Sequence, residues 1–448
     1  MKKSWLCIFL LLFFLNVGLI GFWATKLTHR ATIKESIEIE IFSAPEQSLK
    51  VDLNKVFSRR YLEIKSKENF KFQQEQGNEG PGKPLDYLKI PLYIQSSRPR
   101  NETHDITLLI QCSLSRLESI MDIARSWDGI ISLAVYIQNP NVLSQLQDVL
   151  LGFFFEAESV NPLVRIDISL LFGQRFSRSP SNPLHKPLLN LEELESNNSE
   201  LFEYHPYDFV YPVNTLRNLA FETASTELIF NIDSDFLPSK DMYSKLISMY
   251  DTLMMENSKK TVFVVAAFEM LGPFPRNEIP FPRESLDFYC YDLLALPFHS
   301  KFIISKKKMN MTSVKAWCEG QIEKYHISVS PIQGRTNFTR WFTAKTPYLI
   351  PFGKGLDRFF EPYLIAKKSI FPKFDESFRG YSFNKRSHIT ELQYAKFQFY
   401  TLPEIFLIHR SHESSNSKTI LKKNKVVDET VQRTYEYFMS EIRKKYPR

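Results

Sequence analysis

The chain has 448 residues, of which 43% are hydrophobic and 24% are charged, with a formal net charge of +7. This length and apolar content are ample for one large domain, or two modest ones, with a real core. The basic residues are spread among acids and the densest cluster is Lys306-Lys307-Lys308, so we expect no nucleic-acid partner.

The N-terminus carries an apolar run over residues 5–25 that follows Lys2 and Lys3. About 20 apolar residues are enough to cross a bilayer as a helix. A cleaved signal peptide has a shorter apolar core ending in small residues, whereas Phe22-Trp23 stands at that point here. We therefore expect a cytoplasmic tail at residues 1–4 and a transmembrane signal-anchor at residues 5–25.

Residues 26–103 are predicted to form a stem, because the stretch from Gln73 to Pro84 is polar and rich in Gly and Pro. Four N-glycosylation triplets follow the anchor and favour a body in the secretory lumen. They are Asn101-Glu102-Thr103, Asn197-Asn198-Ser199, Asn310-Met311-Thr312 and Asn337-Phe338-Thr339.

The cysteines have no spacing typical of a metal site. Cys7 lies in the expected anchor, which leaves Cys112, Cys290 and Cys318 in the body. One disulfide can form among these three, and we favour Cys290–Cys318, with Cys112 as a buried free thiol.

From residue 104 the sequence alternates short apolar runs with helical spacings of three and four residues. Expected strands cover residues 106–110, 130–137, 164–171, 228–232 and 261–268, and expected helices cover 114–124, 142–155, 212–224 and 239–255. This alternation predicts an α/β domain at residues 104–448, with a mainly parallel sheet and helices on both faces. The half after about residue 270 is richer in Pro and aromatics, and we expect it to form a looped acceptor-binding half.

The expected strand 228–232 ends in Asp233-Ser234-Asp235, the only Asp-x-Asp triplet in the sequence. Ligands of parallel sheets bind beyond the carboxyl ends of the strands. Two carboxylates at such an edge can hold a divalent cation that bridges to the diphosphate of a nucleotide sugar. The alternative is that Asp233 caps the strand and Asp235 is a solvated turn residue.

A third metal ligand is expected near the C-terminus. The apolar run Ile405 to Ile408 reads as a buried strand that ends at His409. Imidazole is a suitable ligand for Mn²⁺, although a single histidine is more often an ordinary hydrogen-bonded residue.

The segment from Tyr211 to Ala220, together with Asp233 to Ser239, resembles glycosyltransferase family 49. That family includes the C-terminal domain of LARGE glycosyltransferases and the β-1,4-glucuronyltransferase of the α-dystroglycan pathway. Four further blocks are similar to it, at residues 126–136, 360–363, 378–385 and 407–409, and the similarity spans about residues 105 to 448. The chain departs from the family pattern at Ser234, where an apolar residue is usual, and at Gly380-Tyr381-Ser382.

The resemblance implies a GT-A fold and an inverting transferase that uses Mn²⁺ and a UDP-sugar. It implies transfer of glucuronic acid to a β-linked xylose on a glycan or glycoprotein acceptor. Asp233 and Asp235 match the metal motif of the family, and His409 matches its C-terminal metal histidine. With the anchor and the glycosylation triplets, this points to a single-pass type II protein of the Golgi membrane whose catalytic domain is lumenal.

An inverting transfer requires a base that takes the proton of the acceptor hydroxyl. Three acids in the looped half are candidates, namely Asp375, Glu376 and Glu361, and most exposed acids are merely solvated. Asp375 and Glu376 are preferred because they directly precede the block at residues 378–385.

Six polar residues are candidates for donor binding. Lys385 and Arg217 can meet phosphate or a donor carboxylate, or can form surface ion pairs. Asn214 and Asn218 can hydrogen-bond uridine or solvate a helix. Gln111 and Ser113 lie at the end of the first expected strand, the edge that faces base and ribose.

Two other functions compete with a glucuronyltransferase. One is a transferase of the same architecture that uses UDP-N-acetylglucosamine, UDP-xylose or UDP-galactose. The other is a non-catalytic lumenal scaffold that binds carbohydrate. The presence of Asp233, Asp235 and His409 counts against the scaffold, because an inactive copy is free to lose them.

Overall fold

The computed structural model describes residues 87–98, 104–138, 143–173, 210–256, 260–272, 274–292, 294–302, 327–352, 357, 359–410 and 424–447. The chain divides into the units Met1–Val56 and Phe57–Arg448, and every described residue lies in the second. The expected anchor at residues 5–25 falls outside the described residues. Within them, no helix combines the length and the apolar character needed to span a bilayer.

Four parallel strands form the N-terminal half of the main sheet, in the order β4-β3-β2-β5. Their bounds are β2 (Ile106–Ser113), β3 (Ile130–Ile137), β4 (Arg165–Phe172) and β5 (Leu228–Asn231). Every residue of β3, β4 and β5 is buried, which explains their nearly continuous apolar sequences. The strands predicted for this half are confirmed.

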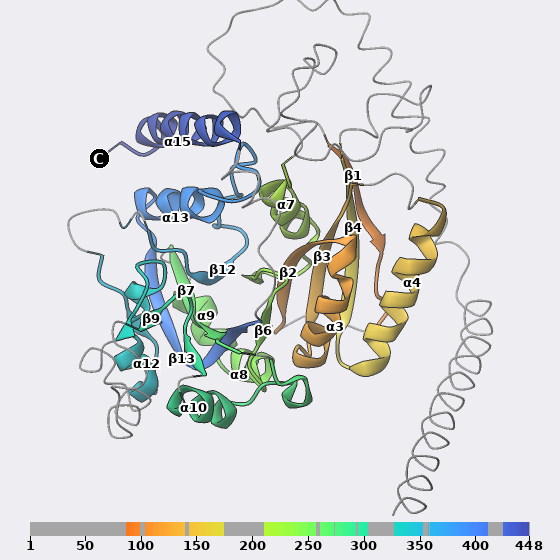
Figure 1. Ribbon diagram of the computed structural model, residues 1–448, viewed down its shortest axis with the longest axis horizontal. Coiled ribbons are helices and arrows are strands. Elements are labelled where there is room, and N and C mark those ends of the chain that lie inside the picture. Colours follow the sequence, from red (N-terminus) through yellow and green to blue (C-terminus); the bar gives the residue numbers. More distant parts are fainter. Residues whose placement is uncertain are drawn as a thin grey trace, which may run out of the picture. The chain divides into compact units, whose positions relative to one another are not determined.

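Helices cover both faces of this half. Figure 1 shows α7 (Val213–Thr223) on one side of the strands and α3 (Leu117–Ser126) and α4 (Leu143–Val160) on the other. A short 3-10 helix, η1 (Leu114–Arg116), links β2 to α3. This arrangement is the one that the alternating sequence pattern predicted.

The other half of the sheet is mixed, which corrects the prediction of a mainly parallel sheet. Strand β12 (Tyr363–Lys367) lies antiparallel between β5 and β7 (Thr261–Met270), and β13 (Gln398–His409) runs parallel to β7. Short strands β6 (Phe236–Pro238), β8 (Ala295–Pro297) and β11 (Tyr348–Leu349) pair antiparallel at its margins. A central strand is apolar whichever way it runs, so periodicity does not reveal its direction.

The predicted boundary between stem and domain is also corrected. Strand β1 (Leu88–Ile94) lies within residues 26–103 and pairs antiparallel with β4, so it belongs to the sheet. It is an edge strand that contains Pro91 and has two exposed positions. Such a strand carries a weak apolar signal, because proline and solvent exposure are tolerated at sheet edges.

The helix predicted at residues 239–255 is instead two helices, α8 (Met242–Ser248) and α9 (Tyr250–Glu256). Pro238 ends β6, which pairs with β13 so that Phe236 stands opposite His409. The remaining elements are α10 (Arg283–Tyr291), α12 (Phe338–Thr343), α13 (Asn384–Tyr394), α15 (Lys425–Lys445), η6 (Arg276–Glu278), η9 (Gly334–Thr336) and the pair β9 (Lys301–Phe302) and β10 (Ile327–Ser328).

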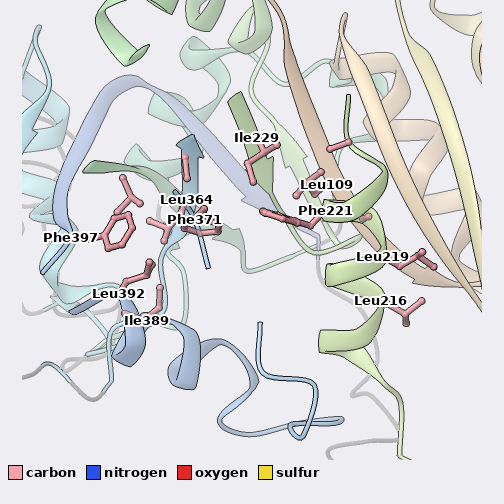
Figure 2. Packing of buried hydrophobic residues seen from close by; sticks show 14 of the residues in the cluster. Leu109, Leu216, Leu219, Phe221, Ile229, Leu364, Phe371, Ile389, Leu392 and Phe397 are labelled. Atoms are coloured by element: carbon pink, nitrogen blue, oxygen red, sulfur yellow. The ribbon is translucent and has the colours of Figure 1, made fainter. Parts of the chain in front are cut away.

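One apolar cluster joins the two halves. Leu216 and Leu219 of α7 pack with residues of the sheet, and the same cluster extends to Ile389 and Leu392 of α13 (Figure 2). A second cluster packs α15 onto Phe378 and Phe383. The segment that connects β12 to α13 is therefore held from both sides.

Cys112 is a buried free thiol, as expected, and burial raises its pKa to about 12. Cys290 is buried in α10, whereas its proposed partner Cys318 lies outside the described residues, so that disulfide remains a prediction. Of the four glycosylation triplets, the one at Asn337 is described. Asn337 is exposed, and its side chain accepts a hydrogen bond from the Arg340 amide at the start of α12.

Replacing each of two glycines with alanine tests the packing of this fold, because the two replacements should change the free energy of unfolding in opposite directions. A Cβ at the buried Gly129 would lie 2.7 Å from Tyr243 Cδ2. The Tyr243 ring packs on Trp127 and its hydroxyl donates to Asp105, so it cannot move without loss. We expect Gly129→Ala to lower the free energy of unfolding by about 2 kcal/mol.

The control is Gly152→Ala, on an exposed position of α4 with nothing within 4 Å of the added Cβ. This variant should raise the free energy of unfolding by about 0.5–1 kcal/mol, because alanine restricts the unfolded chain and favours helix. Chemical denaturation measures both changes. Equal stability of the two variants would contradict the packing around Gly129.

Candidate active site

Asp233 follows the carboxyl end of β5 and is shared by three other elements. Its Oδ1 accepts a hydrogen bond from Arg217 of α7 at 2.8 Å. Its Oδ2 accepts from the Tyr363 hydroxyl of β12 and from Lys385 Nζ of α13, both at 3.0 Å. Lys385 also lies 3.0 Å from the Tyr363 hydroxyl. One carboxylate thus joins α7, β5, β12 and α13.

The charges around Asp233 keep it ionised. Burial by itself would raise its pKa, but Lys385 and Arg217 together lower it from 3.8 to about 2. A lowered carboxyl pKa means that the contribution to stability is complete above pH 3.8 and is lost as the pH falls toward 2. Asp233 is therefore a fixed negative charge at any physiological pH.

Arg217 is buried among polar partners. Its other terminal nitrogen donates to the side-chain oxygens of Asn214 and Asn384, at 2.9 and 3.0 Å. Its guanidinium carbon lies 5.2 Å from the centre of the Phe374 ring. Because 2% of its side chain is exposed, Arg217 has almost no surface to offer a ligand. Lys385, at 16%, is the more accessible of the two cations beside Asp233.

Asn214 and Asn218 hold the segment before α13 against α7. Asn214 Nδ2 donates to the carbonyls of Asp375 and Asn384, at 2.8 and 3.1 Å. Asn218 exchanges hydrogen bonds with the backbone of Phe374, at 2.8 and 2.9 Å. Both side chains are buried and engaged by protein. We therefore revise the predicted uridine contact: these asparagines position the segment that carries Lys385.

Asp235 and His409 meet beside this carboxylate. His409 Nε2 lies 3.4 Å from Asp235 Oδ2, because β6 pairs with β13 directly after the Asp233-Ser234-Asp235 triplet. The rings of Phe236 and Phe298 each lie 4.9 Å from the imidazole, centre to centre. His409 thus has one polar side toward Asp235 and an apolar wall.

The triplet is fixed by the residue after His409. The Arg410 amide donates to the Asp235 carbonyl at 3.0 Å, and its guanidinium donates to the Ser234 carbonyl at 3.3 Å. The same guanidinium reaches α3 through Asp122 Oδ2 at 2.5 Å. The backbone that presents Asp235 is therefore tied to both β13 and α3.

The side chains at this edge include candidate ligands for a divalent cation but do not surround one. In the parts of the chain that are described, no three His, Cys, Asp or Glu side chains are grouped closely enough to hold a metal ion. Asp235 and His409 together supply a carboxylate and an imidazole, the ligands that Mn²⁺ accepts. Both oxygens of Asp233 already bind protein donors. The residues present thus fit a cation in part, because they would offer it one carboxylate and one imidazole.

The three candidate bases lie in different surroundings. Asp375 Oδ1 accepts from the Ser377 amide at 2.9 Å, and the residue lines a cavity beside α15. Glu376 accepts from Asn218 at 2.9 Å and pairs with Lys89 of β1 at 3.5 Å. Glu361 is partly buried and interacts electrostatically with Lys385, Arg386, Arg217 and Asp233. Its pKa is raised by burial, against the lowering effect of these cations.

The end of β2 is partly closed by the segment before α7. The Gln111 side-chain oxygen accepts a hydrogen bond from the Tyr211 hydroxyl, and Gln111 is buried. The Ser113 hydroxyl is 3.0 Å from that of Ser115 and is more accessible. Both residues lie at the carboxyl edge of the sheet, as predicted.

Four site residues were missed by sequence reasoning. Tyr363 and Asn384 lie inside blocks of family resemblance, but nothing in a single sequence pairs them with Asp233 or Arg217. Arg410 directly follows His409, where a basic residue at a strand end gives a weak signal. Glu269 stands opposite His409 in the β7–β13 register. Burial raises the pKa of the Glu269 carboxyl, although the nearby His409 acts to lower it.

Comparison with known proteins identifies relatives along most of the chain. Xylosyl- and glucuronyltransferase LARGE2 of Mus musculus is 25% identical over 378 residues, which cover 84% of this chain and 43% of LARGE2. Xylosyl- and glucuronyltransferase LARGE1 of Homo sapiens is 28% identical over 350 residues, which cover 78% of this chain and 36% of LARGE1. The chain thus spans less than half the length of these relatives.

Two solved structures are similar to the chain at low scores. They are GalNAc-T7 with UDP, GalNAc and Mn²⁺, and residues 1–349 of S. aureus TarS in complex with UDP. GalNAc-T7 has a TM-score of 0.34 and 11% identity over 78% of this chain and 59% of its own. TarS has a TM-score of 0.34 and 9% identity over 76% of this chain and 72% of its own. Scores at this level support no conclusion about function.

The family model described as glycosyl-transferase for dystroglycan matches residues 105–447. That range contains all described strands except β1, and all the candidate site residues. The chain therefore belongs to this glycosyltransferase family.

Proposed function

We propose that the chain is an inverting, metal-dependent transferase of the GT-A class. It moves glucuronic acid from a UDP-sugar to a xylose-terminated glycan on a glycoprotein. One cluster of residues carries the proposal. In it Asp233, held by the side chains of Arg217 and Lys385, lies beside the pair Asp235 and His409 at one edge of the sheet. Membership of the family and the similarity to the xylosyl- and glucuronyltransferases LARGE1 and LARGE2 support the sugar assignment.

Asp235 and His409, with the negative charge of Asp233 beside them, would hold a divalent cation such as Mn²⁺. When bound, the cation supplies positive charge that stabilises the departing diphosphate. Arg217 and Arg410 contribute by fixing the two ends of the triplet in advance, so that little rearrangement is needed.

Lys385 is the cation best placed to meet a donor phosphate or the carboxylate of glucuronic acid. It is partly accessible and lies against the face of the Tyr363 ring, with Nζ 4.2 Å from the centre. Gln111 and Ser113 offer polar atoms for ribose and base at the end of β2. Arg217, Asn214 and Asn218 act indirectly, because they hold Asp233 and the segment before Lys385.

Glu361 is the base that the surroundings favour. The acceptor hydroxyl oxygen attacks the anomeric carbon, its proton passes to Glu361, and the bond from that carbon to the diphosphate breaks. Nearby positive charge surrounds the Glu361 carboxylate, which accepts no hydrogen bond from any described residue, whereas the carboxylates of Asp375 and Glu376 do. Its raised pKa strengthens it as a base.

The protein would reside in the Golgi membrane with a single N-terminal anchor and a lumenal catalytic domain. We expect peptide-N-glycosidase to increase its mobility on a gel, because Asn337 and the three other triplets follow the anchor. In sealed Golgi vesicles, added protease should leave the body intact. An unchanged mobility together with digestion from the cytosolic side would reverse the proposed topology.

The donor is tested by measuring UDP release by the purified full-length chain with Mn²⁺ and each of four donors, UDP-glucuronic acid, UDP-N-acetylglucosamine, UDP-xylose and UDP-galactose. UDP-glucuronic acid should give the highest rate with a β-xyloside. Asp235→Asn and His409→Ala should lose at least about 100-fold in rate and still fold, because the backbone pairing of β6 with β13 does not depend on either side chain.

Asp233→Asn provides the matched comparison in the same assays. It should also lower the free energy of unfolding by about 3 kcal/mol, because the buried charge of Arg217 loses its counter-ion. Preference for another donor would refute the sugar assignment. Full activity in excess chelator would refute the metal assignment.

The base is tested by amide variants of the three acids. Glu361→Gln should reduce the transfer rate by roughly 100- to 10,000-fold and spare UDP affinity, whereas Asp375→Asn and Glu376→Gln should change the rate little. Because a raised pKa leaves the base protonated in acid, the wild-type rate should fall as the pH drops through it. Normal turnover of Glu361→Gln would return the role to Asp375 or Glu376.

A further inference from the structure

A stack of rings and one guanidinium runs from α15 to the surface beside the candidate active site. The Tyr435 and Phe383 rings are parallel to within 21°, with centres 4.2 Å apart. The Arg386 guanidinium carbon lies 4.6 Å from the centre of the Phe383 ring and 5.1 Å from that of the Phe359 ring. The order is Tyr435, Phe383, Arg386 and Phe359.

The inner members of the stack are held firmly. Phe383 is 8% exposed and belongs to the apolar cluster that packs α15 onto this segment. Figure 1 shows α13 and α15 side by side, so the stack connects two adjacent helices. Cation–π contacts of this kind contribute about 0.5–1 kcal/mol at exposed sites and more where water is excluded. The outer ring therefore has a preformed support.

Phe359 is the outer ring, and 56% of it is exposed. Arg386 lies over one face of the ring, so most of the exposed area belongs to the other face and the edge of the ring. The residue stands two positions before Glu361 and four before Tyr363, whose hydroxyl donates to Asp233. Phe359 is thus a largely exposed aromatic ring two residues before the proposed base.

A second exposed aromatic, Tyr381, lies four residues before Lys385. Tyr381 is 46% exposed, and its neighbour Gly380 donates its amide to the Tyr211 carbonyl at 2.7 Å, just before α7. The exposed aromatic side chains of the described residues are Phe288, Phe359, Tyr381 and Tyr437. Two of the four therefore lie on the segments that carry Glu361 and Lys385.

An exposed aromatic beside a transfer site suits a sugar. A pyranose presents C–H groups on its faces and hydroxyls around its rim, so it combines an apolar surface with hydrogen-bonding groups. A β-xylopyranoside has all its ring substituents equatorial, which leaves both faces as C–H surface. Binding sites use aromatic side chains for such faces and a few polar groups for orientation.

We propose that Phe359, supported by Arg386 on Phe383 and Tyr435, is the platform on which the acceptor pyranose lies. Its reacting hydroxyl then points toward Glu361. This inference rests on the proposed transferase function and adds the acceptor subsite. Phe359 touches the acceptor ring, whereas Arg386, Phe383 and Tyr435 act as positioning residues.

The test compares Phe359→Ala with Phe288→Ala in the full-length protein. Phe288 is the matched control, because it is 59% exposed and lies on α10. Binding of methyl β-xyloside is measured by saturation-transfer NMR in the presence of UDP and Mn²⁺, and KM for the same acceptor is measured with UDP-glucuronic acid. UDP affinity is titrated separately.

Phe359→Ala should weaken acceptor binding and raise its KM about tenfold, with UDP affinity unchanged. Phe288→Ala should match the wild type, and Phe359→Trp should restore binding because it keeps an aromatic face. Equal binding in Phe359→Ala and the wild type, or no binding to the wild type, would overturn the platform. Sugar binding that depends on Phe359 without any transfer would support the platform and refute the proposed function instead.

Discussion

The ion pair between Arg217 and Asp233 is the constraint on which the rest of the site depends. Arg217 is almost fully buried in α7, and a buried guanidinium requires a counter-charge with well-formed hydrogen bonds. Asp233 supplies that charge, and in doing so it fixes the strand end where the Asp-x-Asp triplet begins. The second carboxylate oxygen of Asp233 accepts hydrogen bonds from Lys385 and Tyr363, which come from the other half of the chain. The site is assembled around a carboxylate that the fold itself needs.

The mixed order of the sheet explains how distant residues reach this carboxylate. β12 is inserted between β5 and β7, and its antiparallel direction brings its first residue, Tyr363, to the edge where β5 ends. β13 runs parallel to β7 and therefore ends at the same edge, at His409. A purely parallel sheet would place the first residue of a strand at the opposite edge. The reversal of β12 is thus what allows Glu361 and Asp233 to interact.

Strand ends were the most predictable part of the molecule, because an apolar run followed by polar residues is a local pattern. The positions of Asp233, Asp235, Gln111 and His409 were all predicted in this way. Burial of polar side chains was not predictable. Arg217 and Lys385 are both basic residues in blocks of family resemblance, and only the folded structure separates a buried cation from an accessible one. The same holds for Asp375, whose carboxylate caps a turn, and for the edge strand β1.

The two halves of the chain divide the proposed work between donor and acceptor. Gln111, Ser113 and the Asp-x-Asp triplet belong to the parallel half, whereas Glu361, Phe359 and Tyr381 belong to the half that follows residue 270. The element Gly380-Tyr381-Ser382, which departs from the family pattern, lies on this second side, where Gly380 and Ser382 have left-handed backbone, with φ of 62° and 78°. Residues with a side chain rarely adopt such a conformation unless their surroundings impose it. Here the packing of Phe383 against Tyr435 holds the segment. We therefore expect a change in this element to act on the proposed acceptor side, and the ion pair of Arg217 and Asp233 to keep the proposed donor side in place.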